Sequence, residues 1–332
     1  MKEARGFKNK HLQFIAVILL VVFLLSAVLV FVSVWEKFNS GPNFPGEITT
    51  STTFTYNGEE YVLKDGIETV LILGLDKFEG EFDSTAYNND KQSDFIMLLV
   101  IDNNNRKCTA IHINRDTMVD MNVLGLAGEK VGTVNKQIAL AHTYGNGREV
   151  SCGNVADAVS RLLLGIKVDR YISVPMDAVA EFNDLVGGVE VEVLDDFTGI
   201  DDTLIKGETV TLTGAQALTY VRTRYGMEDS TNEHRMVRQR QYIKALYEKT
   251  VETSKNDDNF VVNASTTMGD YLVSNYTITR LQELFNKVSD YRFAEIRYLE
   301  GESVVGEKFM EFTPNEDSIK KVVVELFYSL KD

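Results

Sequence analysis

The chain has 332 residues, of which 44% are hydrophobic, and its 49 acidic and 34 basic side chains give a net charge of −15. A chain this acidic is not expected to carry the basic surface that nucleic acid requires, so we exclude a nucleic-acid-binding protein. The four histidines show no spacing typical of a zinc site.

The first predicted element is a membrane-spanning helix at residues 12–35. Its sequence, LQFIAVILLVVFLLSAVLVFVSVW, is uncharged, and a helix of this length crosses a hydrocarbon core of about 30 Å. The preceding segment, 1–11, is rich in Lys and Arg, so the positive-inside rule predicts a cytoplasmic N-terminus and an extracellular remainder. A cleaved signal peptide is the alternative, but its apolar core is usually about 7–15 residues long. We therefore expect an uncleaved anchor and a protein of the cell membrane.

A flexible linker is predicted at residues 36–60. The stretch 39–58 is rich in Ser, Thr, Pro, Gly and Asn, a composition typical of a tether with little fixed structure. Residues 61–332 then form the predicted extracellular domain. Their number suits one large α/β domain, and two small domains are the other arrangement.

Apolar runs and helical patterns alternate along this domain. The runs at 68–75 and 94–102 are typical of strands that are buried on both faces. A third run at 108–113 follows three asparagines, so 94–113 is a predicted hairpin. The alternation predicts an α-β-α sandwich with a mixed central sheet. The other predicted elements are helices at 154–165, 176–186, 212–222 and 314–330, and strands at 170–174 and 189–193.

Five arginines lie close together in the sequence of this acidic chain. Arg222 and Arg224 have the spacing of a strand, which predicts that they point to one side. The next helix is predicted to turn Arg235, Arg238 and Gln239 toward the interior or a cleft. Guanidinium groups at such a position suit phosphate oxygens, whereas a network of salt bridges is the structural alternative. The cluster consists of Arg222, Arg224, Arg235, Arg238 and Arg240.

Acidic residues occur at the ends of the predicted strands. Asp76 follows the first strand, and Asp116 follows the third. Asp94 stands at the start of the second strand, and it reaches the same edge if that strand is antiparallel. Ligands gather beyond the carboxyl ends of strands in open α/β sheets. Carboxylates beside arginines are therefore predicted to form a Mg²⁺ site that binds a phosphate ester or pyrophosphate, although each is by itself a common turn residue.

The two cysteines, Cys108 and Cys152, belong to the domain that is predicted to face an oxidising compartment. A disulfide bond between them and two free, buried thiols are the two interpretations that the sequence leaves open.

The sequence resembles the LytR-CpsA-Psr family of bacterial cell-envelope glycopolymer ligases over essentially its whole length. Six segments carry this resemblance in the order that the family has them. They are LILGLD (71–76), QSDFIML (92–98), INRDTM (113–118), RYISVPMDAVAEFNDLVGGVEVEV (170–193), LTGAQALTYVRTR (212–224) and RMVRQRQYI (235–243).

The resemblance implies roles for particular residues. Asp76 and Asp94 would hold Mg²⁺ (or Mn²⁺) and act in catalysis together with Arg115, and Asp94 is our first choice for the base. Two positions depart from the family. Gln92 replaces a common Arg, which removes one phosphate contact, and Asn114 replaces a Pro, a change expected to affect only the backbone. The implied pyrophosphate ligands are Arg115, Arg222, Arg224, Arg235, Arg238 and Gln239, with Asn135 near the site.

The resemblance also implies a reaction. A glycopolymer such as teichoic acid or capsule, linked to a polyprenyl-pyrophosphate carrier, is transferred to a hydroxyl of peptidoglycan. A phosphodiester forms, and polyprenyl monophosphate leaves. Two alternatives stay open: a pyrophosphatase that acts on the same lipid-linked substrate, and a non-enzymatic envelope regulator or lipid-binding module.

Overall fold

The computed structural model describes residues 50–331 except 81–85, 258, 270 and 308, and all of them belong to one compact unit, 44–332. Within these residues, no helix is long and apolar enough to cross a membrane. The predicted cytoplasmic stub (1–11) and membrane anchor (12–35) lie outside the described residues, so both stay predictions.

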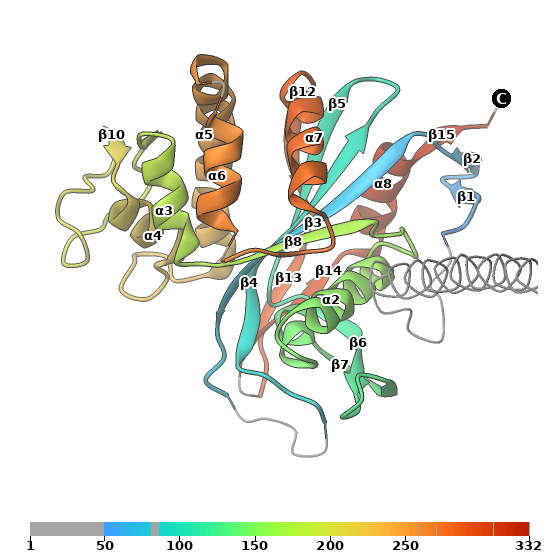
Figure 1. The fold of residues 1–332 in the computed structure, drawn as a ribbon. Helices are drawn as coiled ribbons and strands as arrows, with labels where there is room; N and C mark the ends of the chain where they lie inside the picture. The colour runs from blue at the N-terminus through green and yellow to red at the C-terminus, as the bar shows by residue number, and fades with distance from the viewer. Residues whose placement is uncertain (1–49, 81–85, 258, 270, 308, 332) are drawn as a thin grey trace, which may run out of the picture. The chain divides into compact units, whose positions relative to one another are not determined.

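A six-stranded mixed sheet forms the centre of this unit (Figure 1). Strands β3, β4 and β5 form an antiparallel meander, which confirms the predicted hairpin at 94–113. Strand β8 is parallel to β3, and β12 is parallel to β5. The mixed central sheet is therefore confirmed. The strand order is β11 (Val273–Ser274), β8 (Arg170–Pro175), β3 (Ile67–Lys77), β4 (Lys91–Asp102), β5 (Lys107–Ile113) and β12 (Arg292–Tyr298).

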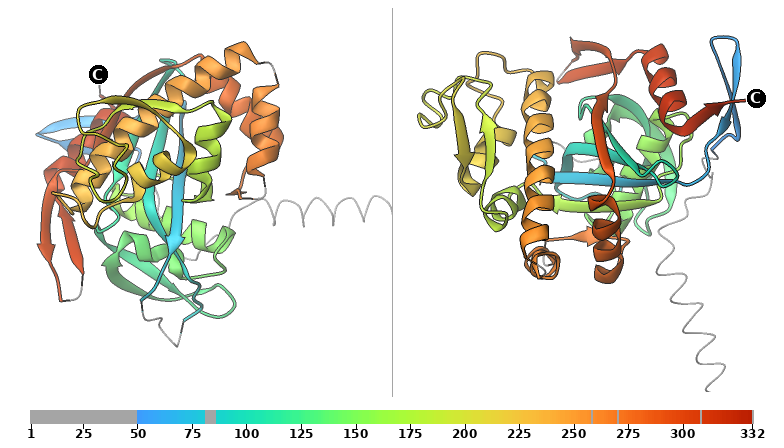
Figure 2. Two further views of the ribbon diagram at one scale, coloured as in Figure 1. Left: turned by 90° about the vertical axis from the view of Figure 1, so that its left-hand side faces the viewer. Right: turned by 90° about the horizontal axis from the view of Figure 1, so that it is seen from above.

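Helices cover both faces of this sheet, because its central strands are apolar on both faces (Figure 2). In β4, Ile96 and Leu98 belong to one core cluster, and Phe95 and Met97 belong to the other. The first cluster includes residues of η1 (Ile138–Thr143), α2 (Glu149–Leu162) and α8 (Glu316–Phe327). The second includes residues of α3 (Ala178–Leu185), α4 (Gly214–Arg222), α5 (Asn232–Asn256) and α6 (Phe260–Met268), and α7 (Ile278–Ser289) packs beside a third, smaller cluster.

The prediction of a flexible linker over 36–60 is wrong at its C-terminal end. Residues Thr53–Tyr56 form strand β1, which pairs with β2 (Glu59–Leu63). The turn between them is Asn57-Gly58, and both residues have positive φ, 51° and 82°. An Asn-Gly pair between alternating β-branched and aromatic residues is a strong hairpin signal. The hairpin is part of a small sheet because β15 (Tyr328–Leu330) pairs with β2.

The described residues also form three separate two-stranded sheets. The predicted strand at 189–193 exists as β9, but it pairs with β10 away from the central sheet. Two further hairpins, β6–β7 and β13–β14, both contact the segment that follows β5. They touch that segment directly: the Phe312 amide donates to the Asp116 carbonyl (2.9 Å). The elements are β6 (Met118–Leu124), β7 (Lys130–Gln137), β9 (Val189–Glu192), β10 (Thr209–Leu212), β13 (Gly301–Val305) and β14 (Met310–Pro314).

The two cysteines are free and buried, so the disulfide alternative is not realised. Cys108 lies in the small cluster beside α7, and Cys152 is a buried residue of α2 that belongs to the first cluster. Burial raises the pKa of Cys152 to about 12, so its thiol stays protonated at neutral pH.

Candidate active site

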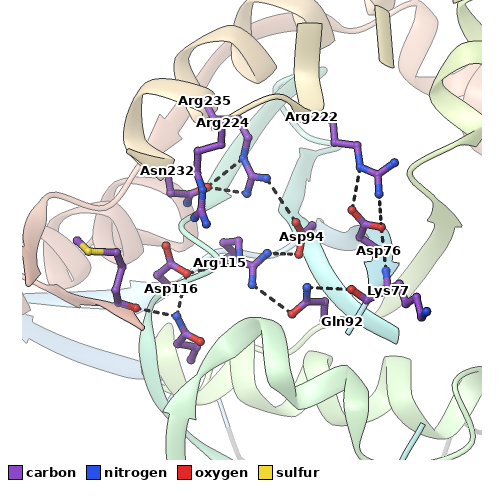
Figure 3. A network of polar contacts seen from close by, with 12 residues as sticks. Asp76, Lys77, Gln92, Asp94, Arg115, Asp116, Arg222, Arg224, Asn232 and Arg235 are labelled. Carbon is purple, nitrogen blue, oxygen red and sulfur yellow. Dashed lines mark hydrogen bonds and ion pairs between the residues drawn. The ribbon is translucent and has the colours of Figure 1, made fainter. Parts of the chain in front are cut away.

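The acidic strand ends gather at one edge of the central sheet, as predicted. Because β4 is antiparallel to both β3 and β5, its start lies beside the ends of those two strands. Asp76 at the end of β3, Asp94 near the start of β4 and Asp116 after β5 therefore face the same region (Figure 3).

A β-bulge places Asp94. The register between β3 and β4 shifts here: Phe95 pairs with Gly74, and Ser93 pairs with Leu75, so Asp94 is the extra residue. A bulge bends its strand and redirects a side chain. The Asp94 carboxylate consequently meets α5, where the NH1 atom of Arg235 lies 3.4 Å from Oδ2.

Arg115 is the centre of the polar network (Figure 3). Its NH1 group pairs with Asp94 Oδ1, its NH2 group donates to Gln92 Oε1 (3.2 Å), and its Nε lies 3.5 Å from Asp116 Oδ1. The side chain is 14% exposed. Gln92, which departs from the family pattern, thus supplies a neutral acceptor that orients Arg115. A planar guanidinium held on three sides presents its donors in a fixed direction.

Asp116 is buried beside Arg115. Its Oδ1 atom accepts from Gln137 Nε2 (2.9 Å), and the same amide nitrogen donates to the Met310 carbonyl (2.7 Å). Burial raises the pKa of the Asp116 carboxyl, while Arg115, Arg224 and Arg235 act to lower it. The net direction is upward, which favours a carboxylate that can take up a proton.

Arg235 lies on the inward face of α5, as the helical spacing predicted, and it is only 4% exposed. Its Nε and NH2 groups donate to Asn232 Oδ1 (3.1 and 2.7 Å). Burial lowers the pKa of Arg235, and Asp94 opposes that shift. Asn232 and Asp94 thus satisfy a guanidinium that would be costly to bury alone.

Asn114 does more than shape the backbone, so that expectation is wrong. Its Oδ1 atom accepts from Asn232 Nδ2 (2.6 Å) and from the Asp116 amide (2.9 Å). Its Nδ2 group donates to Glu233 Oε1 (3.3 Å). A proline at this position has no polar side chain, and this link between the β5 end and α5 would be lost.

Arg222 and Arg224 do not lie on a strand, and the prediction based on strand spacing is wrong. Helix α4 begins at the capping box of Thr213 and Gln216, as predicted, and it continues to Arg222. Arg222 forms a bidentate pair with Asp76 (2.7 and 3.0 Å). Arg224 follows the helix and lies over the Tyr225 ring, 4.7 Å from its centre.

Arg238 and Gln239 are held by packing contacts. Arg238 is 1% exposed, its Nε lies 3.2 Å from Asp195 Oδ2, and its guanidinium lies over the ring of Phe197 (5.3 Å). Gln239 donates to the Val221 carbonyl (3.0 Å). Neither residue lines the cavity described next. Their assignment as pyrophosphate ligands stays a prediction.

A cavity of about 870 Å³ opens beside Arg115. Of the predicted site residues, Arg115, Arg224 and Asn135 line it. Asn135 stands on β7 and donates to Asp120 Oδ1 (2.8 Å). The residues that line the cavity and that the sequence did not single out are Phe78, Gly80, Met118, Lys136, Gln137, Leu140, Tyr225, Val305, Phe309, Met310 and Glu311.

Asp116 also lines the cavity. Its position after a strand placed it among the predicted carboxylates of the site, although the resemblance assigned it no role. Gln137 is the last residue of β7 and carries no comparable signal. The β13–β14 hairpin lies nearly two hundred residues beyond Asp116 in the sequence, and no local pattern connects the two.

Among the described residues, no group of three His, Cys, Asp or Glu side chains is arranged to hold a metal ion. Mg²⁺ at phosphate sites is often held by one or two carboxylates together with substrate phosphates. Asp76 and Asp94 supply two carboxylates from neighbouring strands, so the donor set fits Mg²⁺ with a phosphate substrate.

A family model described as the LytR_cpsA_psr family matches residues 43–326. A polyisoprenyl-teichoic acid–peptidoglycan teichoic acid transferase TagU of Enterococcus faecalis is 28% identical over 225 residues, which cover 67% of this chain and 59% of that protein. The TagU of Bacillus mycoides is 31% identical over 183 residues, covering 54% and 52%. Biofilm regulatory protein A of Streptococcus mutans is 26% identical over 205 residues, covering 59% and 47%. The chain thus spans about half the length of these relatives.

Solved structures share the fold. The crystal structure of Bacillus subtilis TagT is 21% identical, with a TM-score of 0.58, and the match covers 79% of this chain and 90% of that one. A structure of TagT with bound octaprenyl pyrophosphate lipid is 22% identical, with a TM-score of 0.56 and coverage of 79% and 89%.

Proposed function

The chain belongs to the LytR-CpsA-Psr family, and we propose that it is a phosphotransferase that moves a glycopolymer from a polyprenyl-pyrophosphate carrier to a hydroxyl of peptidoglycan. The observation that carries this proposal is the position of Arg115. This largely buried guanidinium is fixed by Asp94 and Gln92, and it lines a cavity large enough for a small-molecule substrate. The names of the relatives as teichoic acid transferases support the same activity.

The arginines of the site bind the pyrophosphate in this proposal. Arg115 and Arg224 line the cavity, so a bound pyrophosphate meets their guanidinium groups first. Arg222 lies at the same sheet edge on Asp76, and it is 46% exposed, which leaves it free to exchange partners. Arg235 is buried, and its field favours negative charge nearby without its having to move.

Asp76 and Asp94 would hold Mg²⁺. When bound, the ion would neutralise charge on the transferring and leaving phosphates. The protein's own part is to keep both carboxylates in place: Arg222 holds Asp76, and Arg115 and Arg235 hold Asp94.

We place this reaction at the outer face of the cell membrane, with residues 12–35 as the anchor. A carrier lipid and an anchored enzyme share one leaflet, which raises their effective concentration.

The test is a product assay on the detergent-solubilised protein with a polyprenyl-pyrophosphate-linked saccharide, Mg²⁺ and a soluble peptidoglycan glycan strand. We expect polyprenyl monophosphate to appear together with a phosphodiester-linked product. Arg115→Ala should lower that rate by about 100-fold or more. Arg280→Ala is the matched control, because Arg280 is 70% exposed on α7.

The outcomes separate the candidate functions. Monophosphate released at the same rate without the glycan strand indicates a pyrophosphatase. No monophosphate under any condition, with unchanged envelope phenotype in Arg115→Ala cells, would support the non-enzymatic regulator and refute the transferase.

A further inference from the structure

We propose that the cavity beside Arg115 is the binding site of the acceptor sugar, and that Asp116 is the catalytic residue that takes the proton of its attacking hydroxyl. This inference rests on the proposed phosphotransfer and assigns the base to a residue other than Asp94.

The contacts of the three carboxylates at the sheet edge distinguish them. Asp94 has a guanidinium on each oxygen, from Arg115 and Arg235. Asp76 likewise has Arg222 on both oxygens. The oxygens of Asp76 and Asp94 are thus committed to guanidinium groups and, in the proposed function, to Mg²⁺, which makes them poorly placed to receive the proton of an incoming hydroxyl.

Asp116 leaves one oxygen available. Its contacts with Gln137 Nε2 (2.9 Å) and Arg115 Nε (3.5 Å) both fall on Oδ1, and in the described part of the chain Oδ2 accepts no hydrogen bond. The residue lines the cavity even though it is only 4% exposed. A general base must reach the proton that it abstracts, and of the three carboxylates at the sheet edge Asp116 is the one that combines a free oxygen with this access.

Two hairpins hold Asp116 in position. Gln137 at the end of β7 donates to its Oδ1 atom, and the Phe312 amide of β14 donates to its carbonyl oxygen. Gln137 also donates to Met310, which ties β7 to β14 (2.7 Å). The carboxylate and the backbone of Asp116 are therefore each held by a hydrogen bond, which suits a group that must accept a proton in one direction.

The walls of the cavity suit a sugar. Tyr225 and Phe309 line it, and they are 76% and 58% exposed, so their rings are accessible to the apolar face of a pyranose. Asn135 and Glu311 add planar polar groups that exchange hydrogen bonds with hydroxyls. A mostly apolar cavity with a few converging polar groups is the usual form of a small-molecule site.

The proposed transfer step needs no reactant other than the acceptor hydroxyl, the carrier-linked donor and the Asp116 carboxylate. The acceptor oxygen attacks the glycan-bearing phosphorus, and its proton passes to Oδ2 of Asp116. The new O–P bond forms as the P–O bond to the carrier phosphate breaks, and that bond's electron pair leaves with polyprenyl monophosphate. Arg115 lies between Asp94 and Asp116 (Figure 3), so the phosphate that it binds is next to the proposed base.

The experiment compares Asp116→Asn with wild type for three quantities: transfer to a soluble peptidoglycan glycan strand, the acceptor KM, and the Kd for octaprenyl pyrophosphate. We expect kcat to fall about 10²- to 10⁴-fold, while the Kd changes by less than about threefold because the arginines remain. Asp290→Asn is the matched control on the exposed end of α7, with unchanged kcat.

A second variant tests the sugar site without disturbing the core. Phe309→Ala removes an exposed ring at the mouth of the cavity, and we expect the acceptor KM to rise about fivefold or more with unchanged kcat and Kd. It remains informative if Asp116→Asn fails to fold.

Two results overturn the inference alone, provided that the wild-type protein catalyses transfer. One is a folded Asp116→Asn variant that keeps more than a third of the wild-type kcat. The other is a Phe309→Ala variant whose acceptor KM is unchanged. A wild-type protein that releases no monophosphate with any acceptor overturns the proposed function, and this assignment falls with it.

Discussion

Arg238 is the residue for which sequence pattern and structure lead to opposite expectations. The family pattern makes it a ligand of the pyrophosphate, whereas the structure places it against Asp195 in the packing between α5 and the loop after β9. Replacing it by Met removes the charge but keeps most of the side-chain volume. The variant therefore separates a structural role from a ligand role.

The magnitude follows from the burial of the pair. The two side chains are 1% and 7% exposed, and removing one partner of such a pair costs about 3–5 kcal/mol, because the other charge stays buried. His234 Nδ1 remains 3.4 Å from the other oxygen of Asp195 and partly compensates, so we expect about 3 kcal/mol. At about 2–4 °C per kcal/mol, the Tm should fall by about 6–12 °C.

Urea titration and thermal melting measure the loss, and octaprenyl pyrophosphate binding at a temperature where the variant is folded measures the ligand role. Arg238→Met with Asp195→Asn should regain most of the stability, since neither charge is then left alone. Arg280→Met, which breaks an exposed ion pair, should cost less than about 1 kcal/mol. If Arg238→Met loses less than about 1 kcal/mol but binds the lipid more than tenfold weaker, the structural reasoning is refuted.

The fold should lose stability in acid because of His142, whose pKa burial lowers to about 4. Since the unfolded chain binds this proton near pH 6.5 and the native chain does not, stability should decrease by about 3 kcal/mol as pH falls from about 6.5 to 4. Urea titrations at several pH values in this range measure the free energy of unfolding, which should depend less steeply on pH in His142→Asn than in the wild type. An equal pH dependence of the two proteins would contradict the assignment. Deletion of residues 1–35 should leave the transfer reaction in detergent intact but impair glycopolymer attachment in cells. Full complementation by a secreted, unanchored form would argue against the anchor's role.

Local sequence pattern was sufficient to predict a structural feature wherever the signal for that feature lies within one helix, strand or turn. The continuous apolar runs of β3 and β4 predicted strands buried on both faces, and the capping box at Thr213 predicted the start of α4. The Asn57-Gly58 turn carried an equally local signal, but the Ser- and Thr-rich composition around it favoured a tether. The gathering of Asp76, Asp94 and Asp116 was also predictable, because strand direction alone brings those ends together.

The site was less predictable because its contacts join distant segments. Arg235 and Arg238 both lie on the inward face of α5, three residues apart, and helical spacing cannot distinguish them. One meets Asp94 at the sheet edge, and the other meets Asp195. That difference depends on how α5 packs against β4 and the loop after β9.

The sequence by itself determined the strands, the inward face of α5, and the set of acids and arginines available for chemistry, because periodicity and capping act over a few residues. Only the tertiary structure decided which carboxylate each arginine meets, and that two hairpins far apart in the chain both donate hydrogen bonds to Asp116. The physical reason is that charge pairing and cavity shape are set by distances across the fold, which no local pattern contains.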